Sequence, residues 1–358
     1  MPEVTVVMSV FNGEPYLASA LESIVTQSIR EFDVLVVNDG STDRGPAILD
    51  AYAARDSRIK VIHQPNAGIA AAANRACALV TSPYIARMDA DDVSLHNRLE
   101  RQLHFLRARP DVVLLGGGAE VIDESGNGLF SIDVPTGNDE IKAVLHERNA
   151  FVHSSVVIRR DALLAVGGYR RAFSNVSEDY DLWLRLAERY PVANLADVVV
   201  RYRVHRRQTS TAKLEAQTLA ALGARVSARF RRAGQHDPFG SVDSVSRETL
   251  LRLGISKSEI DGEVARATAS WAKVMSRAGY HDTAVTLARK AWHVGPDRIV
   301  TRDDIGRFYL AAARASLDRG RVAHSLLAAV LALRWRPSLL GRIVRGGLRR
   351  LTGSLPGG

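Results

Sequence analysis

Three aspartates lie within four residues in the tetrad Asp89-Ala90-Asp91-Asp92. The tetrad follows the apolar run at residues 84–88 and precedes a helical pattern that begins near Leu95. An Asp-x-Asp pair at the end of a strand can hold a divalent cation with the phosphates of a substrate, because Mg²⁺ and Mn²⁺ prefer carboxylate, phosphate and water oxygens. Taken alone, so short an acidic motif is more often a turn that caps the next helix.

A further aspartate, Asp39, follows the apolar run at residues 32–37, in a segment whose composition is that of a turn. Its carboxylate could accept hydrogen bonds from a uracil imide or a ribose hydroxyl, or it could simply close an Asx-turn. After the first apolar run there is no G-x-G-x-x-G, only Gly13, so we expect a cation rather than a glycine loop to neutralise a pyrophosphate. The base end of this site would be lined by Ser9, Phe11, Asn12 and Glu14.

A second acidic cluster, at residues 177–181, opens a helical pattern that continues to residue 189. Ser177 as an N-cap, with acids in the first turn, is also what a helix dipole favours without any catalytic role. A carboxylate that binds a metal has lowered basicity, so a transfer that ejects a nucleotide diphosphate needs a separate general base. Asp179 is the candidate base, and Glu178 and Trp183 are candidates for the acceptor side.

A histidine, His205, directly follows the apolar run at residues 198–204. It stands among the basic residues Arg201, Arg203, Arg206 and Arg207. The imidazole could ligate the cation or contact a phosphate, and the arginines could hold a diphosphate through paired hydrogen bonds. The alternative is a packed histidine beside a solvated basic edge.

Apolar runs alternate with helical patterns over about the first 100 residues, which favours an α/β fold with a mostly parallel sheet and helices on both faces. The expected strands are residues 4–10, 32–37, 59–63 and 84–88, and the expected helices are residues 16–25, 47–53 and 67–80. Ligands bind outside the carboxyl ends of the strands in such sheets. We therefore expect the polar segments 9–14, 38–43 and 89–92 to converge.

After a helix expected at residues 95–107, the alternation loosens and then gives way to helices alone. Strands are expected at residues 112–116, 129–134, 152–159 and 198–204, with helices at residues 139–146 and 180–189. Later patterns are helical, at residues 214–232, 257–278, 282–294, 303–319 and 322–333. The sequence therefore predicts an α/β domain at residues 1–212 and an all-α region at residues 213–358, with a loose period near that of tetratricopeptide units.

Charge is distributed unevenly along the 358 residues. Residues 1–205 carry 21 basic and 27 acidic side chains, whereas residues 206–358 carry 27 and 12. The acidic first part does not suit a nucleic-acid partner, and none is expected, while the basic second part indicates an anionic partner. Residues 321–358 hold seven arginines and no acid, so residues 321–352 are predicted to lie as a helix on an anionic membrane or to form a solvated basic face.

No targeting or membrane-spanning segment is recognisable in the sequence. The run at residues 4–10 is short and lacks the basic flank of a signal peptide, and no stretch approaches the roughly 18 apolar residues of a membrane span. We expect a cytoplasmic protein, with a peripheral place on the cytoplasmic face of the membrane if residues 321–352 bind lipid. The single cysteine, Cys77, excludes an intrachain disulfide and falls in a helical pattern that predicts a buried thiol.

A series of motifs runs in order through about residues 3–211: V-x-V-V-M-S-V-F-N-G, V-V-N-D-G-S-T-D, Q-P-N-A-G-I-A-A-A-A-N, Y-I-A-R-M-D-A-D-D, H-S-S-V-V-I-R-R, G-G-Y, S-E-D-Y-D-L-W-L-R-L and Y-R-V-H. In these motifs the chain resembles the family 2 glycosyltransferases. The resemblance implies a GT-A fold, a nucleotide-sugar donor that is usually a UDP-sugar, and inversion at the anomeric carbon. One departure is Ala73, where relatives often have arginine.

The resemblance also implies roles for single residues. Asp39 would contact the nucleotide, and Asp179 would act as the base. Asp89 and Asp91 would form the Asp-x-Asp pair, with Asp91 on Mn²⁺ or Mg²⁺ and His205 at the metal or the diphosphate. The donor-binding set would be completed by Ser9, Phe11, Asn12, Glu14, Gly68, Asn74, Arg87 and Ala90.

We therefore predict an inverting, metal-dependent glycosyltransferase of the hexosyl or N-acetylhexosaminyl class. It would move a sugar from a nucleotide-sugar to a hydroxyl of a glycan or lipid-linked acceptor, in cell-surface polysaccharide synthesis. The alternative is a non-catalytic protein of the same fold that binds nucleotide-sugars or docks a partner, and three intact site acids speak against it. Nucleotidyl transfer would need a basic glycine-rich loop, which residues 9–14 lack. Residues 151–155, 167–169 and Trp183 are expected to shape the sugar and acceptor pockets.

Overall fold

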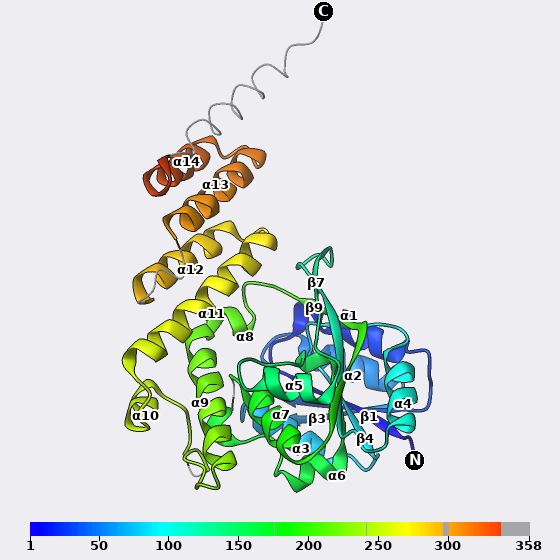
Figure 1. The fold of residues 1–358 in the computed structure, drawn as a ribbon. Coiled ribbons are helices and arrows are strands. Elements are labelled where there is room, and N and C mark those ends of the chain that lie inside the picture. The colour runs from blue at the N-terminus through cyan, green and yellow to red at the C-terminus, as the bar shows by residue number, and fades with distance from the viewer. Residues whose placement is uncertain (175, 241, 296–300, 338–358) are drawn as a thin grey trace, which may run out of the picture. The chain divides into compact units, whose positions relative to one another are not determined.

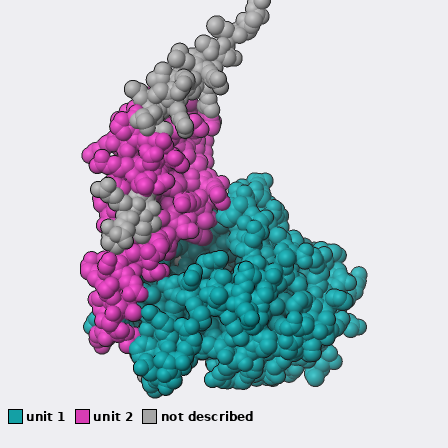
Figure 2. Space-filling model, in the orientation of Figure 1, with its two compact units in different colours: residues 1–250 teal, residues 251–358 magenta. Residues whose placement is uncertain are grey.

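The computed structural model describes residues 1–174, 176–240, 242–295 and 301–337, and its helices and strands are drawn in Figure 1. The chain divides into two compact units, Met1–Leu250 and Leu251–Gly358, which Figure 2 distinguishes by colour. The first unit holds the sheet and the motifs discussed above. The second is helical throughout its described residues.

The first half of unit 1 is a parallel sheet, as the alternating pattern predicts. Its strands are β1 (Val4–Val10), β2 (Asp33–Asp39), β3 (Ile59–Gln64) and β4 (Tyr84–Met88), in the spatial order β3-β2-β1-β4. The connecting helices are α1 (Glu14–Val25), α2 (Gly45–Arg55) and α3 (Ile69–Leu79). Near-continuous apolar strands such as β1 are buried on both faces, which is the pattern of a parallel sheet covered by helices.

The second half of the sheet is mixed, so the expectation of a mostly parallel sheet is correct only for its first half. The added strands are β5 (Val93–Ser94), β6 (Leu114–Ile122), β7 (Gly128–Ile132), β8 (Val157–Arg159) and β9 (Val192–Arg203). The order continues from β4 as β8-β6-β9-β5, and β7 pairs with β6. β6 and β9 are parallel, whereas β8 lies antiparallel to both β4 and β6. The direction of so short a strand depends on its neighbours and cannot be derived from its own apolar pattern.

Three strands differ clearly from their predicted bounds, and β9 is one of them, because it begins at Val192 instead of residue 198. In the other two, local geometry overrides the apolar pattern. Within the expected strand 152–159, His153–Ser155 form a short 3₁₀ turn, η1, before β8 begins. β6 runs on to Ile122 through three glycines, where its pairing with β9 shifts register. A Cβ atom at Gly117 would lie 2.7 Å from Val199 Cγ2, so this close approach of two strands requires glycine.

Helices complete unit 1 and extend it beyond residue 212. They are α4 (Arg98–Ala108), α5 (Asn138–Leu145), α6 (Arg160–Ala165), α7 (Glu178–Arg189), α8 (Thr209–Ala212), α9 (Leu214–Arg232) and α10 (Arg247–Arg252). α9 packs on α7 and buries one face there. The boundary expected between residues 212 and 213 therefore lies inside a compact unit, because α9 is needed to cover α7.

Unit 2 consists of helices that each pack on the next along the chain. They are α11 (Lys257–Arg277), α12 (His281–Val294), α13 (Arg302–Asp318) and α14 (Val322–Trp335), close to the predicted bounds. Their shared core is rich in alanine, which permits close helix packing. None of the described helices combines the length and the hydrophobicity needed to cross a bilayer. Of the basic segment 321–352, the part from residue 338 onward lies outside the described residues.

Candidate active site

The polar segments at the ends of β1, β2 and β4 lie side by side, as expected. Asn12 joins the first two segments, because its amide donates to Ser41 Oγ (3.0 Å) and its side-chain oxygen accepts from the amide of Thr42 (2.8 Å). A Cβ atom on Gly13 would lie 3.3 Å from that of Ala90, which brings the third segment alongside. The sheet thus gathers at one edge residues that are up to 80 positions apart in sequence.

Asp39 is buried and its carboxylate holds the loop that leads into α3. One oxygen accepts from Gln64 Nε2 (2.7 Å) and the amide of Ala67 (2.8 Å), and the other accepts from the amide of Gly68 (2.8 Å). Asp39 is only 2% exposed. A nucleotide would meet this carboxylate through its remaining lone pairs, so both the turn and the binding interpretation of Asp39 are compatible with its position.

The other residues expected at the base end differ in their availability. Phe11 is 54% exposed and presents its ring to solvent. Ser9 Oγ is buried and has no hydrogen-bond partner, whereas Glu14 accepts from the amide and Nε of Arg44 (3.0 and 2.6 Å). Phe11 can therefore receive a ligand directly, whereas the Ser9 hydroxyl is covered and Glu14 first has to leave Arg44.

Asp89 is fixed in a charged form at the end of β4. Arg87, itself buried, donates to Asp89 Oδ1 (2.6 Å), and Ser154 Oγ donates to Asp89 Oδ2 (2.8 Å). Burial alone would raise the pKa of Asp89, but the charge of Arg87 and the Ser154 hydrogen bond contribute to a pKa below its usual range. Asp89 is therefore an oriented acceptor, suited to binding a ligand hydroxyl.

Asp91, two residues after Asp89, faces His205. His205 Nε2 lies 3.0 Å from Asp91 Oδ2, and the ring of Tyr16 packs on the imidazole with centroids 4.9 Å apart. Asp92 is buried instead, and burial together with the charges of Asp91 and Asp89 raises its pKa well above the usual range. Of the three aspartates, Asp91 has a side chain that is 33% exposed and can reach a ligand.

The described residues hold no group of three or more His, Cys, Asp or Glu side chains that could by itself bind a metal ion. Mg²⁺ and Mn²⁺ are often bound by one or two protein carboxylates and completed by substrate phosphates and water, and Asp91 fits such a site. His205 fits less well, because its Nδ1 accepts from the amide of Arg207 (3.2 Å), so Nε2 carries the proton that it shares with Asp91.

The arginines near His205 are largely engaged within the protein. Arg203 is buried, donates to the backbone oxygens of Asp91 (2.9 Å) and Asp123 (3.1 Å), and lies over the ring of Tyr16. Arg201 donates to Glu120 Oε2 (2.7 Å). These two side chains are engaged near the ends of β4 and β9, and Arg206 and Arg207 are exposed.

Glu178 and Asp179 open α7 and differ in exposure. Asp179 is half-buried, and its Oδ2 accepts from Asn149 Nδ2 (3.0 Å). Glu178 is buried, and burial together with the charge of Asp179 raises the pKa of Glu178 to about 8. The sequence predicts that the Ser177 side chain caps α7, but it makes no capping hydrogen bond. Its hydroxyl donates instead to the backbone oxygen of Gln217 on α9 (3.0 Å).

His153 interacts with both acidic groups and falls in the segment 151–155, which the sequence predicts to shape the sugar and acceptor pockets without singling out this side chain. Its Nδ1 is 3.8 Å from Asp89 Oδ2, and its Nε2 is 3.5 Å from the hydroxyl of Tyr169. Burial and the charge of Arg87 lower the pKa of His153, whereas the charges of Asp89 and Asp179 oppose this. The H-S-S motif contains the residue, but its side chain reaches the site only because η1 interrupts the expected strand.

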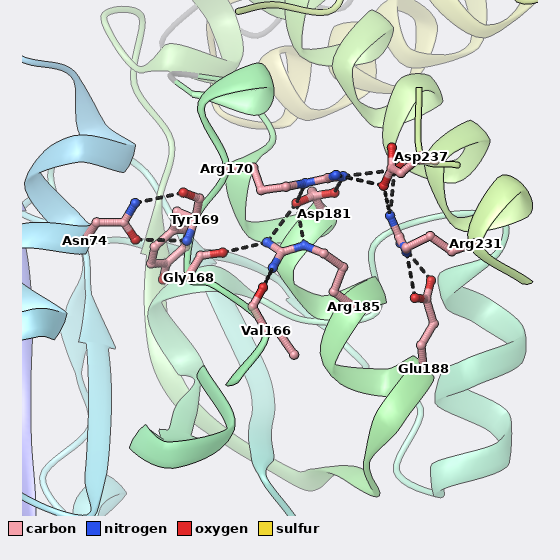
Figure 3. A network of polar contacts seen from close by, with 11 residues as sticks. Asn74, Val166, Gly168, Tyr169, Arg170, Asp181, Arg185, Glu188, Arg231 and Asp237 are labelled. Carbon is pink, nitrogen blue, oxygen red and sulfur yellow. Dashed lines mark hydrogen bonds and ion pairs between the residues drawn. The ribbon is translucent and has the colours of Figure 1, made fainter. Parts of the chain in front are cut away.

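A buried ion-pair network holds the helix that carries Asp179 (Figure 3). The Asp181 carboxylate is fully buried and pairs with both Arg170 and Arg185. Arg185 also donates to the backbone oxygens of Val166 and Gly168, each at 2.6 Å. One carboxylate thereby fixes α7 and the loop before Tyr169 relative to each other.

The same network continues into α9 and the loop after it. Arg170 pairs with Asp237 (2.8 Å), and Arg231 bridges Asp237 (2.6 Å) and Glu188 on α7 (2.7 Å). Figure 3 shows these side chains between the helices. This arrangement gives a polar reason, besides apolar packing, why unit 1 includes α9.

Two predicted site residues have structural positions instead of open ones. The side chain of Asn74 exchanges two hydrogen bonds with the backbone of Tyr169 (2.8 and 2.9 Å), as Figure 3 shows. Gly168 there has a φ of +65°, and a Cβ atom on it would lie 2.6 Å from Asn74 Oδ1. Trp183 is fully buried between Phe151 and His153, with ring centroids 6.0 Å from each. Trp183 is therefore closed to a ligand, whereas Asn74 is partly exposed but has its side-chain amide engaged by the Tyr169 backbone.

Cys77 is buried in α3, as predicted, and burial raises the pKa of its thiol to about 12. A thiol held in this protonated state is a poor nucleophile and a poor metal ligand. Cys77 therefore has no part in the chemistry of the site.

The parallel half-sheet, its mixed extension and the acids at the strand ends define a glycosyltransferase of the GT-A type. Among solved structures, S. aureus TarS 1–349 in complex with UDP-GlcNAc aligns with a TM-score of 0.52 at 14% identity, over 92% of this chain and 90% of that one. The likeness shows the fold. The helical part following the sheet is included in this alignment.

Sequence relatives define the family. The model of the family described as Glycosyl transferase family 2 matches residues 5–167. The O-antigen biosynthesis glycosyltransferase WbnJ of Escherichia coli is 31% identical over 215 residues, which cover 59% of this chain and 83% of WbnJ. The amylovoran biosynthesis glycosyltransferase AmsE of Erwinia amylovora is 32% identical over 203 residues, covering 56% and 75%. The chain belongs to the family 2 glycosyltransferases.

Proposed function

We propose that this glycosyltransferase is an inverting, metal-dependent enzyme that transfers a sugar from a UDP-sugar in the synthesis of a cell-surface polysaccharide. The acceptor would be a hydroxyl of a glycan or of a lipid-linked saccharide. TarS has been solved with UDP-GlcNAc, and WbnJ and AmsE are named for the synthesis of O-antigen and amylovoran. These relatives support the donor class and the product class.

The observation that carries the proposal is the presence of two separate acidic groups around one histidine. Asp89 and Asp91 end β4, whereas Asp179 begins α7, and the charges of both Asp89 and Asp179 act on His153. Binding of a leaving group and removal of a proton need carboxylates with different partners. The two groups supply such carboxylates within one site.

The chemistry assigned to these side chains is a single displacement. Asp179 takes the proton of the acceptor hydroxyl, whose oxygen forms a bond to C1 of the donor sugar while the bond from C1 to the diphosphate breaks. The electron pair leaves with UDP, and attack from the opposite face inverts C1. Asp89, oriented by Arg87 and Ser154, accepts a hydrogen bond from the donor. A cation bound by Asp91 and the diphosphate would supply positive charge against the charge on the leaving UDP.

Substituting the proposed base provides the first test. Asp179→Asn keeps the shape of the side chain but cannot take a proton, so transfer should fall by at least about 100-fold while UDP-sugar affinity stays nearly unchanged. UDP release and calorimetric titration measure the two quantities. Asp139→Asn, an exposed acid at the same place in α5, should leave both unchanged. An equal loss of donor affinity in Asp179→Asn would refute the assignment of the base.

The metal role is tested separately at Asp91. Asp91→Ala should weaken Mn²⁺-dependent binding of the UDP-sugar, and chelation by EDTA should stop transfer by the unmodified enzyme. Full activity in EDTA would exclude a required cation. UDP release by the unmodified enzyme also distinguishes catalysis from a protein that only binds nucleotide-sugars.

We further propose that the C-terminal segment contacts an anionic membrane surface. On α14 the apolar side chains Val322, Leu326, Leu327 and Val330 are 55–63% exposed and recur at helical spacing on one face. Residues 321–358 carry seven arginines and no acid. An exposed apolar face within a basic segment suits a surface of anionic lipid, where a lipid-linked acceptor would be held.

A further inference from the structure

The imidazole of His153 interacts with both acidic groups. It projects from η1, the short turn that also supplies Ser154 to Asp89. Its Nδ1 lies 3.8 Å from Asp89 Oδ2, and the charge of Asp179 also acts on it. With a side chain that is 16% exposed, it is accessible to a ligand while being held by its surroundings.

Neither ring nitrogen of His153 has a short hydrogen bond to any residue that the structure describes. The distance of 3.8 Å from Nδ1 to Asp89 is too long for one, and the 3.5 Å from Nε2 to the hydroxyl of Tyr169 is at the outer limit. Buried polar atoms are normally paired at about 2.7–3.2 Å. The imidazole is therefore able to exchange these loose contacts for a shorter one to a ligand.

Packing fixes the orientation of the imidazole before any ligand binds. The ring of Trp183 meets it at 66° with centroids 6.0 Å apart, and the ring of Tyr169 meets it at 61° with centroids 6.2 Å apart. Trp183 is fully buried, and Asn74 and Arg185 hold the backbone around Tyr169. An oriented polar group on a rigid support is what discrimination between similar ligands requires.

The reaction geometry then specifies what His153 meets. The inference rests on the proposed function: the diphosphate lies at Asp91, and C1 must face Asp179 across the site. The transferred sugar therefore spans the gap between the two acidic groups, and His153 borders this gap. The lowered pKa of His153 leaves it neutral at neutral pH, so one nitrogen accepts and the other donates, which matches a sugar hydroxyl.

We propose that His153 hydrogen-bonds a hydroxyl of the transferred sugar and is a residue by which the enzyme distinguishes donor sugars that differ at that hydroxyl. Asp89 accepts from the sugar on the side of the Arg87 pair, and His153 contacts it on the side of α7. A site that pairs with a ligand hydroxyl rejects an epimer because its own buried polar atoms are then left without partners.

The test compares nucleotide and nucleotide-sugar binding in the full-length protein with Mn²⁺. The probes are UDP, UDP-glucose, UDP-galactose, UDP-GlcNAc and UDP-GalNAc, titrated calorimetrically into the native enzyme, His153→Ala and His153→Asn. In His153→Ala, the affinity for UDP should stay within about twofold of the native value. The affinity for the preferred UDP-sugar should fall about tenfold, which corresponds to the loss of about one hydrogen bond. The ratio of affinities between epimeric UDP-sugars should decrease in His153→Ala, and His153→Asn should recover part of that ratio.

Controls separate this role from a structural one. His104→Ala, an exposed histidine on α4, should change neither affinity. A parallel loss of UDP and UDP-sugar binding, or an unchanged ratio between epimers in His153→Ala, would overturn the assignment of His153. If the native enzyme bound none of the UDP-sugars, the proposed function would fail and the His153 inference with it. If the native enzyme binds and cleaves them while the ratio is unchanged, only the His153 inference fails.

Discussion

The carboxylic acids of the site have different protonation states because their immediate partners differ. Asp89 is paired with Arg87 and hydrogen-bonded by Ser154, and its pKa lies below the usual range. Glu178 is buried next to the charge of Asp179, and its pKa is raised to about 8. At neutral pH Glu178 is therefore largely protonated, and it adds little negative charge beside the proposed base.

The protonation of Glu178 predicts a pH dependence of stability. A buried acid whose pKa rises from 4.5 to about 8 on folding binds a proton in the folded state that the unfolded state has lost. The free energy of unfolding should therefore decrease as the pH rises through this window. Glu178→Gln cannot ionise and should show a weaker decrease, measured by thermal unfolding between about pH 5 and about pH 9.

A matched control for Glu178 is the exposed Glu140 on α5. Glu140→Gln should reproduce the pH dependence of the native protein. If Glu178→Gln also kept the full dependence, the proton uptake would have to be assigned to another buried acid, of which Asp92 is the strongest candidate.

At the scale of the element, one side of α7 carries the proposed base and another side carries a buried ion pair. Asp179 at its start faces Asn149 and the site, while Asp181, two residues later, pairs with Arg170 and Arg185 in the interior. Because a helix is rigid, the residues that hold Asp181 also determine the position of Asp179 in the first turn. The buried pair thus fixes where the proposed base stands.

Removing the Asp181 charge should destabilise unit 1 strongly. Asp181→Asn leaves Arg170 and Arg185 without their buried carboxylate, a change that typically costs about 3–5 kcal/mol. Urea unfolding measures the loss. Asp161→Asn, which removes an exposed pair with Arg159, should cost less than about 1 kcal/mol. Similar small effects in both variants would show that the interior network does not stabilise the fold.

At the scale of the whole molecule, the compact units place the domain boundary within α10, between Leu250 and Leu251, and not before α9. A chain that ends at Gly254 keeps α9 and α10 complete, so we expect cooperative unfolding and retained UDP-sugar binding. A chain that ends at Ala212 lacks α9, exposes the apolar face of α7 and removes Asp237 from Arg170. It should aggregate or unfold at much lower temperature. Equal stability of the two chains would restore the boundary at residue 212.

Membrane association is also a property of the whole chain. The protein should float with vesicles containing anionic phosphatidylglycerol but not with neutral phosphatidylcholine vesicles, and high salt should weaken binding. Leu326→Glu and removal of residues 321–358 should both abolish flotation. Leu79→Glu replaces another exposed leucine, on α3, and should have no effect. Flotation of the shortened chain on anionic vesicles would exclude this segment as the contact.

Much of the fold follows from local patterns that neighbouring residues determine. β1 and β2 are runs of mainly β-branched and other apolar residues, and the helices of unit 2 begin and end close to the predicted residues. The mixed half was less predictable, because the direction of β8 and the length of β9 depend on strands far away in sequence. The turn at His153–Ser155 and the glycines of β6 can be explained only from the residues that pack against them in the folded chain.

The sequence by itself determined the family, the parallel half-sheet and the acids at its carboxyl end, because these depend on periodicity, turn residues and motifs within short segments. Only the tertiary structure decided the protonation of each acid and the hydrogen-bond partners of each polar side chain. Asn74 faces Tyr169 across 95 positions, and Asp89 faces Ser154 across 65. Burial and charge at such contacts arise when distant segments pack together. The sequence therefore placed His153 only within the pocket segment 151–155, and its approach to Asp89 was decided by the folded chain.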